Sequence, residues 1–259
     1  MPFRHAGDIP YFVFDIFRDD PLMHGVFTRR GGTSPAPWES LNLGGSVGDD
    51  PLRVRANKQR VLDALGRSES SLFEVWQMHT DRVVVAERPR QGDTLIQADA
   101  IITRSPDVTL LMRFADCVPI LLYDERQHAI GMVHAGWLGT VRKAAVAAVK
   151  EMGAKFNSRP QDLRAGIGPS IGPDHYPVGA DVLEQVELAF GQDAASHMLV
   201  EDGQVNFDLW SANRALLQQA GVRMIEVSGV CTACHPEDWY SHRGEKGRTG
   251  RFGAAIALQ

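Results

Sequence analysis

Short runs of β-branched and other apolar residues fill the chain between Leu72 and Val133. Runs of this length and composition are typical of strands. We predict strands in the segments FEVWQM, RVVVAE, DAIIT, VTLLMRF, VPILLYD and AIGMV, and a further strand in VRMIEVSGV nearer the C-terminus.

Four segments carry the apolar spacing or the end signals of helices. Asp49 or Asp50 precedes a partial apolar stripe that begins after Pro51, and Gly66 follows it. A helix is therefore expected from Pro51 to about Leu65. The other three helices are expected at about 138–152, 180–190 and 209–220.

Residues 21–50 are rich in Gly, Pro, Ser and Asn, and Trp38, Leu41 and Leu43 interrupt this polar stretch. We expect a long ordered loop here, and loops of this length in compact domains are usually functional. The chain shows no internal repeat and no break in composition. We therefore expect one mixed α/β domain that covers residues 1–259.

Composition narrows the class of protein. The 259 residues are 44% hydrophobic, which is enough to build a core without disulfides or a structural metal. Lys and Arg number 27 against 32 Asp and Glu, and the net charge of -5 argues against general binding to nucleic acid or to an anionic membrane. No apolar run approaches the roughly 20 residues of a membrane-spanning helix. The first residues lack the apolar core of a signal peptide, so a cytoplasmic protein is expected.

Three cysteines, Cys117, Cys231 and Cys234, are an odd number for a disulfide framework. In a reducing compartment, thiolate chemistry or simple burial is favoured over disulfides.

Three residues at predicted strand ends suit a metal site. His79 in QMHTD, Cys117 in FADCVPI and His134 in GMVHAGW each lie where an apolar run meets polar residues or glycine. Strand ends converge on one edge of a sheet, so a shared site is compatible with their spacing. Two imidazoles and a thiolate suit zinc, and three protein ligands leave a fourth position open, as in catalytic zinc sites. The residues alone also leave a framework role open, because buried cysteines are commonly structural.

Two neighbouring features are weaker candidates. Asp116 would point away from Cys117 on a regular strand, which leaves it a role in orienting a ligand histidine or a role as a strand-end cap. CTACH contains Cys231, Cys234 and His235 but has no second pair at zinc-finger spacing. A loop-end cysteine pair is favoured there over a metal site.

Arginines beside glycines are candidates for anion binding, because backbone N–H groups and a guanidinium can then approach one phosphate. The candidates are Arg29, Arg30, Arg60, Arg243 and Arg251. GIGPSIGP, at residues 166–173, is not a dinucleotide fingerprint, because its prolines break the turn-to-helix geometry that such a motif requires. It is expected to form a stiff loop.

Seven short sequence blocks follow one another along the chain: TRRGG, VGDDP with Asn57 downstream, QMHTD, ADCVPILL, VHAGW, IGPSIGP and SHRGEKGRTGR. Together they resemble the YfiH family, also called the multicopper polyphenol oxidoreductase or DUF152 family. The resemblance covers nearly the whole chain, and ADCVPILL and HAGW are its most specific blocks. It implies an α+β fold of the CNF1/YfiH type, which is a mixed β-sandwich flanked by helices.

The same resemblance implies a zinc site with His79, Cys117 and His134 as ligands. It implies phosphorolysis of purine nucleosides (adenosine, inosine, guanosine and methylthioadenosine) and deamination of adenosine. Water on zinc has a pKa of about 7, which suits deamination. Phosphorolysis instead needs an arginine-held phosphate at C1′ of an oxocarbenium-like sugar, and we assign this phosphate to Arg29 and Arg243.

Two other enzyme classes stay open. Older naming treats family members as copper-dependent, laccase-like polyphenol oxidases, and two histidines with one cysteine also suit a single copper. A multicopper centre uses His-x-His pairs, however, and none of the nine histidines is two residues from another. A metal-free cysteine hydrolase would use Cys117 as nucleophile and His134 as base.

Three places depart from the family pattern. Leu138 follows HAGW where a basic residue is common, and Asp174 and His175 stand where many members carry cysteines. Gly244 replaces the second arginine of the usual segment. These departures concern the contacts to phosphate, while the three metal positions and Arg243 are intact.

Overall fold

The computed structural model describes residues 3–92, 94–201 and 203–259. Its helices are α1 (Pro51–Ala64), α2 (Trp137–Val141), α3 (Ala144–Phe156), α4 (Ala180–Phe190) and α5 (Leu209–Gln219). Its strands are β1 (Phe3–Ala6), β2 (Ile9–Phe12), β3 (Leu22–Phe27), β4 (Leu72–Phe73), β5 (Val75–Trp76), β6 (Val83–Val85), β7 (Ile96–Gln97), β8 (Ala100–Thr103), β9 (Thr109–Phe114), β10 (Val118–Asp124), β11 (Ala129–Ala135), β12 (Leu163–Ile167), β13 (Met198–Glu201), β14 (Gln204–Phe207), β15 (Met224–Val227) and β16 (Phe252–Leu258).

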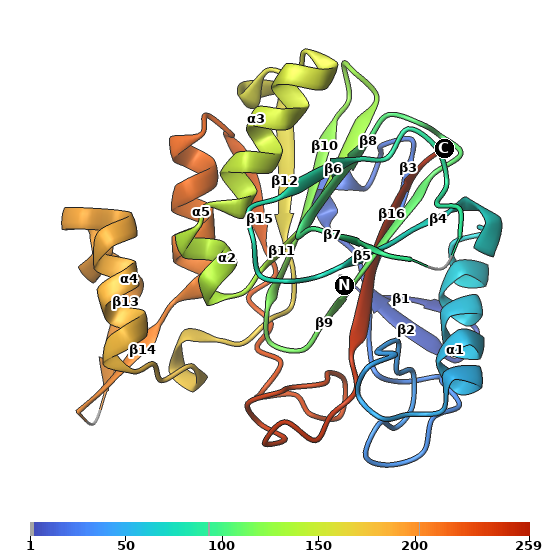
Figure 1. Ribbon diagram of the computed structural model, residues 1–259, viewed down its shortest axis with the longest axis horizontal. Coiled ribbons are helices and arrows are strands. Elements are labelled where there is room, and N and C mark those ends of the chain that lie inside the picture. Colours follow the sequence, from blue (N-terminus) through green and yellow to red (C-terminus); the bar gives the residue numbers. More distant parts are fainter. Residues whose placement is uncertain (1–2, 93, 202) are drawn as a thin grey trace.

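Two six-stranded sheets form the centre of the molecule (Figure 1). One has the order β1-β2-β3-β16-β9-β4 and the other the order β15-β12-β10-β11-β8-β6. Most neighbours are antiparallel, but β4 with β9, β12 with β15 and β6 with β8 are parallel. Two small ribbons, β5-β7 and β13-β14, lie outside these sheets.

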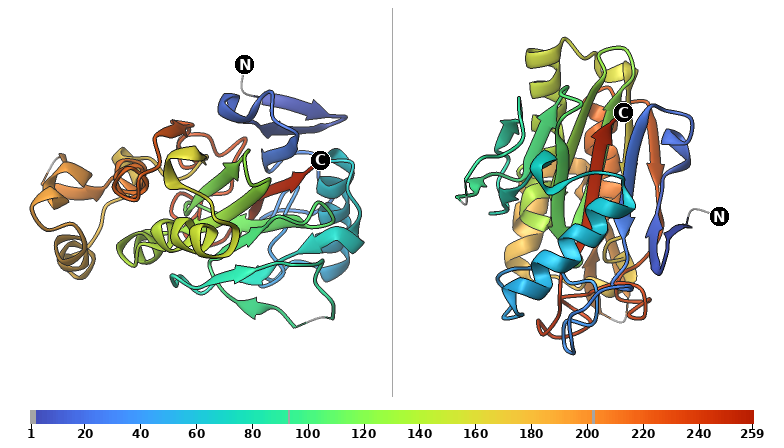
Figure 2. Two further views of the ribbon diagram at one scale, coloured as in Figure 1. Left: turned by 90° about the horizontal axis from the view of Figure 1, so that it is seen from above. Right: turned by 90° about the vertical axis from the view of Figure 1, so that its right-hand side faces the viewer.

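Alternation of side chains along each strand creates the layers. In β9, Leu110 and Met112 enter the core between the sheets, whereas Leu111 packs with Val61 of α1 on the outer face. In β10, Leu121 enters the same central core and its neighbour Leu122 packs in the cluster that includes α3. The order is therefore α1, first sheet, second sheet and remaining helices (Figures 1 and 2). The expected mixed β-sandwich flanked by helices is confirmed.

Capping and small residues explain how the helices fit. Asp50 is the N-cap of α1, and its carboxylate accepts a hydrogen bond from Leu52 N. Helix α3 buries Ala145, Ala148 and Met152, and small residues allow this helix to lie close to β11 and β8.

The structure corrects two expected elements. The loop expected over 21–50 begins only after residue 27, because Leu22–Phe27 forms β3 beside the C-terminal strand. The helix expected at about 138–152 is two helices, α2 and α3, because Lys143 adopts a left-handed φ of 62° that interrupts the helical path. The C-terminal strand β16, which was not predicted, lies in the middle of its sheet.

Within the three described ranges, no helix is long and apolar enough to span a bilayer.

A buried histidine makes the fold sensitive to acid. His24 in β3 is 8% exposed, and its Nε2 accepts a hydrogen bond from Phe14 N at 2.9 Å. Burial and the nearby Arg4 lower the pKa of His24 from 6.5 to about 4. The neutral form stabilises the folded state, so this contribution is complete above pH 6.5 and is lost as the pH falls from 6.5 towards 4.

We predict that His24→Gln, which keeps an acceptor but does not titrate, removes this part of the pH dependence. Between pH 7 and pH 4 the wild type should lose about 3 kcal/mol more unfolding free energy than the variant. Urea unfolding at several pH values measures the difference. Parallel stability curves for the two proteins would contradict the assignment.

Candidate functional site

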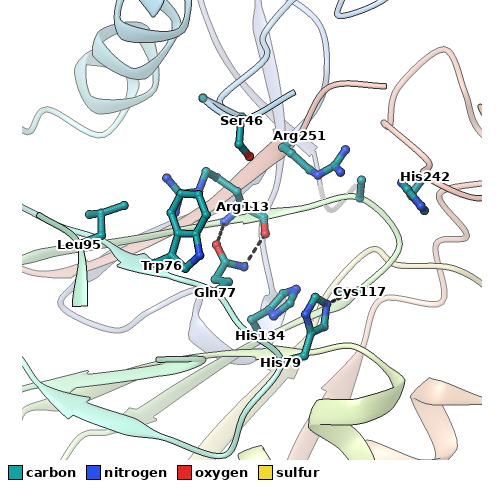
Figure 3. Close-up of a pocket in the computed structure, with 13 residues that line it drawn as sticks. Ser46, Trp76, Gln77, His79, Leu95, Arg113, Cys117, His134, His242 and Arg251 are labelled. Atoms are coloured by element: carbon teal, nitrogen blue, oxygen red, sulfur yellow. Dashed lines mark hydrogen bonds between the residues drawn. The ribbon is translucent and has the colours of Figure 1, made fainter. Parts of the chain in front are cut away.

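His79, Cys117 and His134 converge at one edge of the second sheet (Figure 3). Cys117 immediately precedes β10, and His134 lies opposite Pro119 in the antiparallel pair of β10 and β11. His79 follows β5 in a bend where its own φ is 58°. The Cys117 Sγ and His79 Nε2 atoms are 3.8 Å apart, and the two imidazole centroids are 4.9 Å apart.

Asp99 holds both histidines and was not predicted from the sequence. One carboxylate oxygen lies 2.8 Å from His134 Nδ1, and the other accepts hydrogen bonds from the N–H groups of Met78 and Thr80 at 3.0 and 2.7 Å. The Asp99 carbonyl also accepts from His134 N at 2.8 Å. Asp99 is fully buried, so one carboxylate orients the His134 ring and fixes the backbone on both sides of His79.

Gly136, the glycine of the HAGW block, leaves space for the side chains of Cys117 and His79. A Cβ atom at this position would lie 2.6 Å from Cys117 Sγ and 3.2 Å from His79 Cδ2. These distances are shorter than van der Waals contact, so a larger residue would push the sulfur or the imidazole out of place. The glycine in this block is therefore required by clearance at the site.

The electrostatics of the site favour a thiolate beside an imidazolium when no metal is bound. Burial would raise the pKa of Cys117, but His134 and His79 outweigh it and lower the pKa to about 6. Burial would likewise lower the pKa of His134, but the Cys117 thiolate and Asp99 raise it to about 9. Burial opposes ionisation of Asp99 too, yet the hydrogen bonds from His134 and Thr80 lower its pKa to about 2.

The donor set fits a tetrahedral metal ion. The three ligand atoms all lie within 4.8 Å of one another. Zinc–sulfur and zinc–nitrogen bonds of tetrahedral geometry place sulfur and nitrogen about 3.6 Å apart, close to the 3.8 Å between Cys117 and His79. A thiolate is already favoured at neutral pH, and Asp99 directs the Nδ1 proton of His134 away from the cluster, which leaves Nε2 to face it.

Asp116 does not orient a histidine, which settles the choice left open by the sequence. Its carboxylate accepts hydrogen bonds from Thr232 Oγ1 at 2.8 Å and from Arg243 N at 2.6 Å. Its carbonyl accepts from Ile171 N. Asp116 therefore ties three loops to the end of β10 beside Cys117.

A cavity of about 540 Å³ opens over the three residues. Its size is within the range of small-molecule sites. In Figure 3, Arg251 and Ser46 lie across the cavity from His79 and His134, while Trp76 and Leu95 form one side. The indole of Trp76 is 46% exposed, which is unusual for a large aromatic side chain.

Two arginines line this cavity. Arg113 is neutralised by the buried Glu74, whose carboxylate lies 3.2 Å from its guanidinium. The Arg251 guanidinium donates to the carbonyls of Thr249 and Gly250, and it has no ion pair among the residues that the structure describes. Burial lowers the pKa of Arg251, although the neighbouring Cys117 opposes this effect.

The structure does not bring Arg29 or Arg243 to this cavity. The Arg29 side chain is only 14% exposed, and its guanidinium pairs with Glu245 at 3.0 Å and lies over the Tyr240 ring. The Arg243 guanidinium donates to the Pro177 carbonyl and packs on the Tyr176 ring. Of the arginines expected to bind phosphate, Arg29 is thus engaged by Glu245, and neither Arg29 nor Arg243 lines the cavity over His79, Cys117 and His134.

The other two candidate arginines also bind protein groups. Arg30 pairs with Asp238 at 2.8 Å, and Arg60 donates to the Gly31 carbonyl at 2.6 Å. Neither lines the cavity with His79 and Arg251.

A buried polar network shapes the wall that carries Ser46. Asn57 of α1 donates to the carbonyls of Ser40 and Asn42. The Asn42 Oδ1 atom in turn accepts from Gly44 N and Arg251 N at 2.8 and 2.9 Å. Asn57 therefore fixes the loop at Asn42, and Asn42 in turn positions the backbone of Arg251.

Comparison with known proteins identifies the family. A model described as multi-copper polyphenol oxidoreductase laccase matches residues 23–259. The chain belongs to this family. Among curated relatives, the purine nucleoside phosphorylase of Deinococcus radiodurans is 38% identical over 235 residues, which cover 91% of this chain and 88% of that protein. Purine nucleoside phosphorylase YlmD of Bacillus subtilis is 36% identical over 248 residues, or 92% and 89% of the two chains.

Solved structures of family members have the same fold. The YfiH protein of Bacillus licheniformis superimposes with a TM-score of 0.92 at 33% identity, and YlmD of Geobacillus stearothermophilus with 0.93 at 30% identity. Both matches cover 100% of this chain and 99% of the other chain.

We predict that Cys117 of the metal-free protein reacts as a low-pKa thiol. Its rate of alkylation by iodoacetamide, followed by mass spectrometry of the Cys117 peptide, should rise with a midpoint at pH of about 6. His134→Asn removes the principal positive charge and should move the midpoint towards the ordinary thiol value. The same midpoint in both proteins would contradict the thiolate–imidazolium pair.

Proposed function

We propose that the protein is a zinc-dependent purine nucleoside phosphorylase that also deaminates adenosine. Relatives at 32–38% identity bear the name purine nucleoside phosphorylase, which supports an enzyme of this class. The observation that carries the proposal is one cavity that joins the His79–Cys117–His134 cluster to Arg251, which has no carboxylate partner in the described part of the chain. A metal ion and a phosphate could therefore act on one bound nucleoside.

In this proposal His79, Cys117 and His134 hold the zinc. When bound, zinc would act as a Lewis acid that lowers the pKa of coordinated water to about 7. This is the chemistry that hydrolytic deamination requires. Asp99 contributes by holding the His134 Nδ1 proton and the Met78–Thr80 backbone. Copper remains compatible with two imidazoles and one thiolate, so the identity of the metal is part of the test.

Arg251 is the residue we propose to bind phosphate. A guanidinium binds two phosphate oxygens at once, and partial burial strengthens this charge–charge contact. Phosphate held here would face the sugar and attack C1′, while the bond from C1′ to the purine nitrogen breaks. Ribose 1-phosphate and the free base are the products.

Trp76 is the residue we propose to bind the purine. The indole is exposed at the rim of the cavity beside Leu95, and a purine ring can stack on it. Arg251 lines a different side of the same cavity, so this placement would direct the sugar between base and phosphate (Figure 3).

A second candidate is a cysteine hydrolase. The metal-free site has a Cys117 thiolate beside an imidazolium that a buried carboxylate orients, which is the geometry of an activated nucleophile. Intact-mass spectra recorded during turnover separate the two proposals. A covalent adduct on Cys117 favours the hydrolase, and zinc ligation predicts none.

The direct test is product analysis with adenosine in the presence and absence of phosphate. We predict adenine and ribose 1-phosphate only with phosphate, and inosine in both conditions. Cys117→Ala should lose zinc and both activities. Arg251→Met keeps the apolar stem, and its phosphorolysis should fall by about 10²–10³-fold in kcat/KM, the range for one electrostatic contact, while deamination falls much less.

Arg248→Met is the matched control, because Arg248 is exposed and lies outside the cavity. It should retain both activities and the full zinc content. Equal loss of both reactions in Arg251→Met at full zinc occupancy would show that Arg251 shapes the nucleoside pocket and does not bind phosphate. Oxidation of a polyphenol by the copper-loaded protein, without phosphorolysis by the zinc-loaded protein, would favour the oxidase.

A further inference from the structure

Asp174, His175, Cys231 and Cys234 form a second cluster of metal-ligating side chains, separate from the cavity described above. The sequence favours a simple cysteine pair here, because no second ligand pair stands at zinc-finger spacing. The fold supplies that second pair from a different loop. We propose that these four side chains bind a second zinc ion, with a structural role.

The distances fit one tetrahedral ion. The four ligand atoms all lie within 4.8 Å of one another. The Cys234 Sγ and His175 Nδ1 atoms are 3.6 Å apart, which equals the separation of about 3.6 Å expected for sulfur and nitrogen on one zinc. His175 Nδ1 and Asp174 Oδ1 are 3.0 Å apart, so the carboxylate also reaches the same point.

The backbone brings the two loops together without any help from a metal. Ser170, after β12, forms a parallel bridge with Cys231, after β15. Ser170 N donates to the Val230 carbonyl at 3.1 Å, and Thr232 N donates to the Ser170 carbonyl at 3.0 Å. The parallel pairing of β12 with β15 therefore continues into both loops and delivers one ligand pair from each.

Gly172 keeps space open between the two pairs. A Cβ atom at this position would lie 2.7 Å from Asp174 Oδ1 and 3.1 Å from Cys231 Sγ. The Gly172 N–H also points at the Cys231 sulfur, at 3.1 Å. This N–H donor would orient the sulfur and stabilise its thiolate form if it binds a metal.

The ligand types favour zinc over other divalent ions. Two thiolates exclude magnesium and calcium, which prefer oxygen ligands, and the added imidazole and carboxylate suit zinc. Four protein ligands fill a tetrahedral shell, which is the mark of a structural site. Cys231 is buried while Asp174, His175 and Cys234 are exposed, so an ion can reach the cluster from solvent.

The position of the cluster indicates what the second zinc would stabilise. Thr232, between the two cysteines, donates to Asp116, and Asp116 also accepts from the backbone of Arg243. The next residue after Asp116 is Cys117. An ion that joins the 172–175 loop to the 231–234 loop would therefore stabilise the segment that enters β10, through Thr232 and Asp116.

The test measures zinc per chain in protein reconstituted with zinc sulfate and then dialysed. Cys117→Ala removes a ligand of the first site, and we predict that this protein still binds one zinc per chain. Adding His175→Gln, an exposed substitution that should not disturb folding, should abolish that remaining zinc. Cobalt in place of zinc should give thiolate charge-transfer absorption in Cys117→Ala that disappears with Cys234→Ser.

His235→Gln is the matched control, because His235 adjoins Cys234 but lies 3.3 Å from Glu237 and outside the cluster. In the Cys117→Ala background it should keep the zinc. Equal zinc content with and without His175→Gln would overturn the proposal, as would Cys117→Ala protein that binds no zinc. A Cys231–Cys234 disulfide that persists in reductant would also overturn it. None of these outcomes depends on the nucleoside chemistry.

Discussion

The candidate site depends on one buried carboxylate. Asp99 is fully buried, and unpaired burial of a charge would be strongly unfavourable. Its two oxygens satisfy this requirement by binding His134 Nδ1 on one side and two backbone N–H groups around His79 on the other. Two histidines from segments 55 residues apart are thereby held by the same group, and Cys117 needs only the register of β10 to complete the cluster.

The sandwich explains why these segments can meet. Asp99 precedes β8, which pairs with β11, so the carboxylate lies one position beyond the pair of Ala100 with Val133 and beside His134. The other wall of the cavity comes from the first sheet, where Arg251 precedes β16. The cavity therefore lies where ends of both sheets meet, and each sheet contributes different chemistry: side chains able to bind a metal from one and a cationic group from the other.

Local pattern was enough to predict the apolar strands β9, β10 and β11, whereas the spacing of His79, Cys117 and His134 was only compatible with a shared site and the family resemblance was needed to group them. Asp99 could have been found from its position at the start of the apolar strand segment DAIIT. An acidic residue buried there must have hydrogen-bond partners. Sequence alone could not choose between the arginines proposed for phosphate, since glycines lie near both Arg29 and Arg251. The choice depends on Glu245, which is remote in sequence but neutralises Arg29. Strand β16 was missed because its alanines lack β-branched character.

The central claim is that Asp99 organises the metal site, and zinc affinity of Asp99→Asn tests it most directly. The amide would donate to His134 Nδ1 and move the ring proton to Nε2, where zinc must bind. With His175→Gln in both proteins, so that only the first site is titrated, competition with a chromogenic chelator should show affinity weakened by about 10–100-fold. Equal affinity in the two folded proteins would contradict the account.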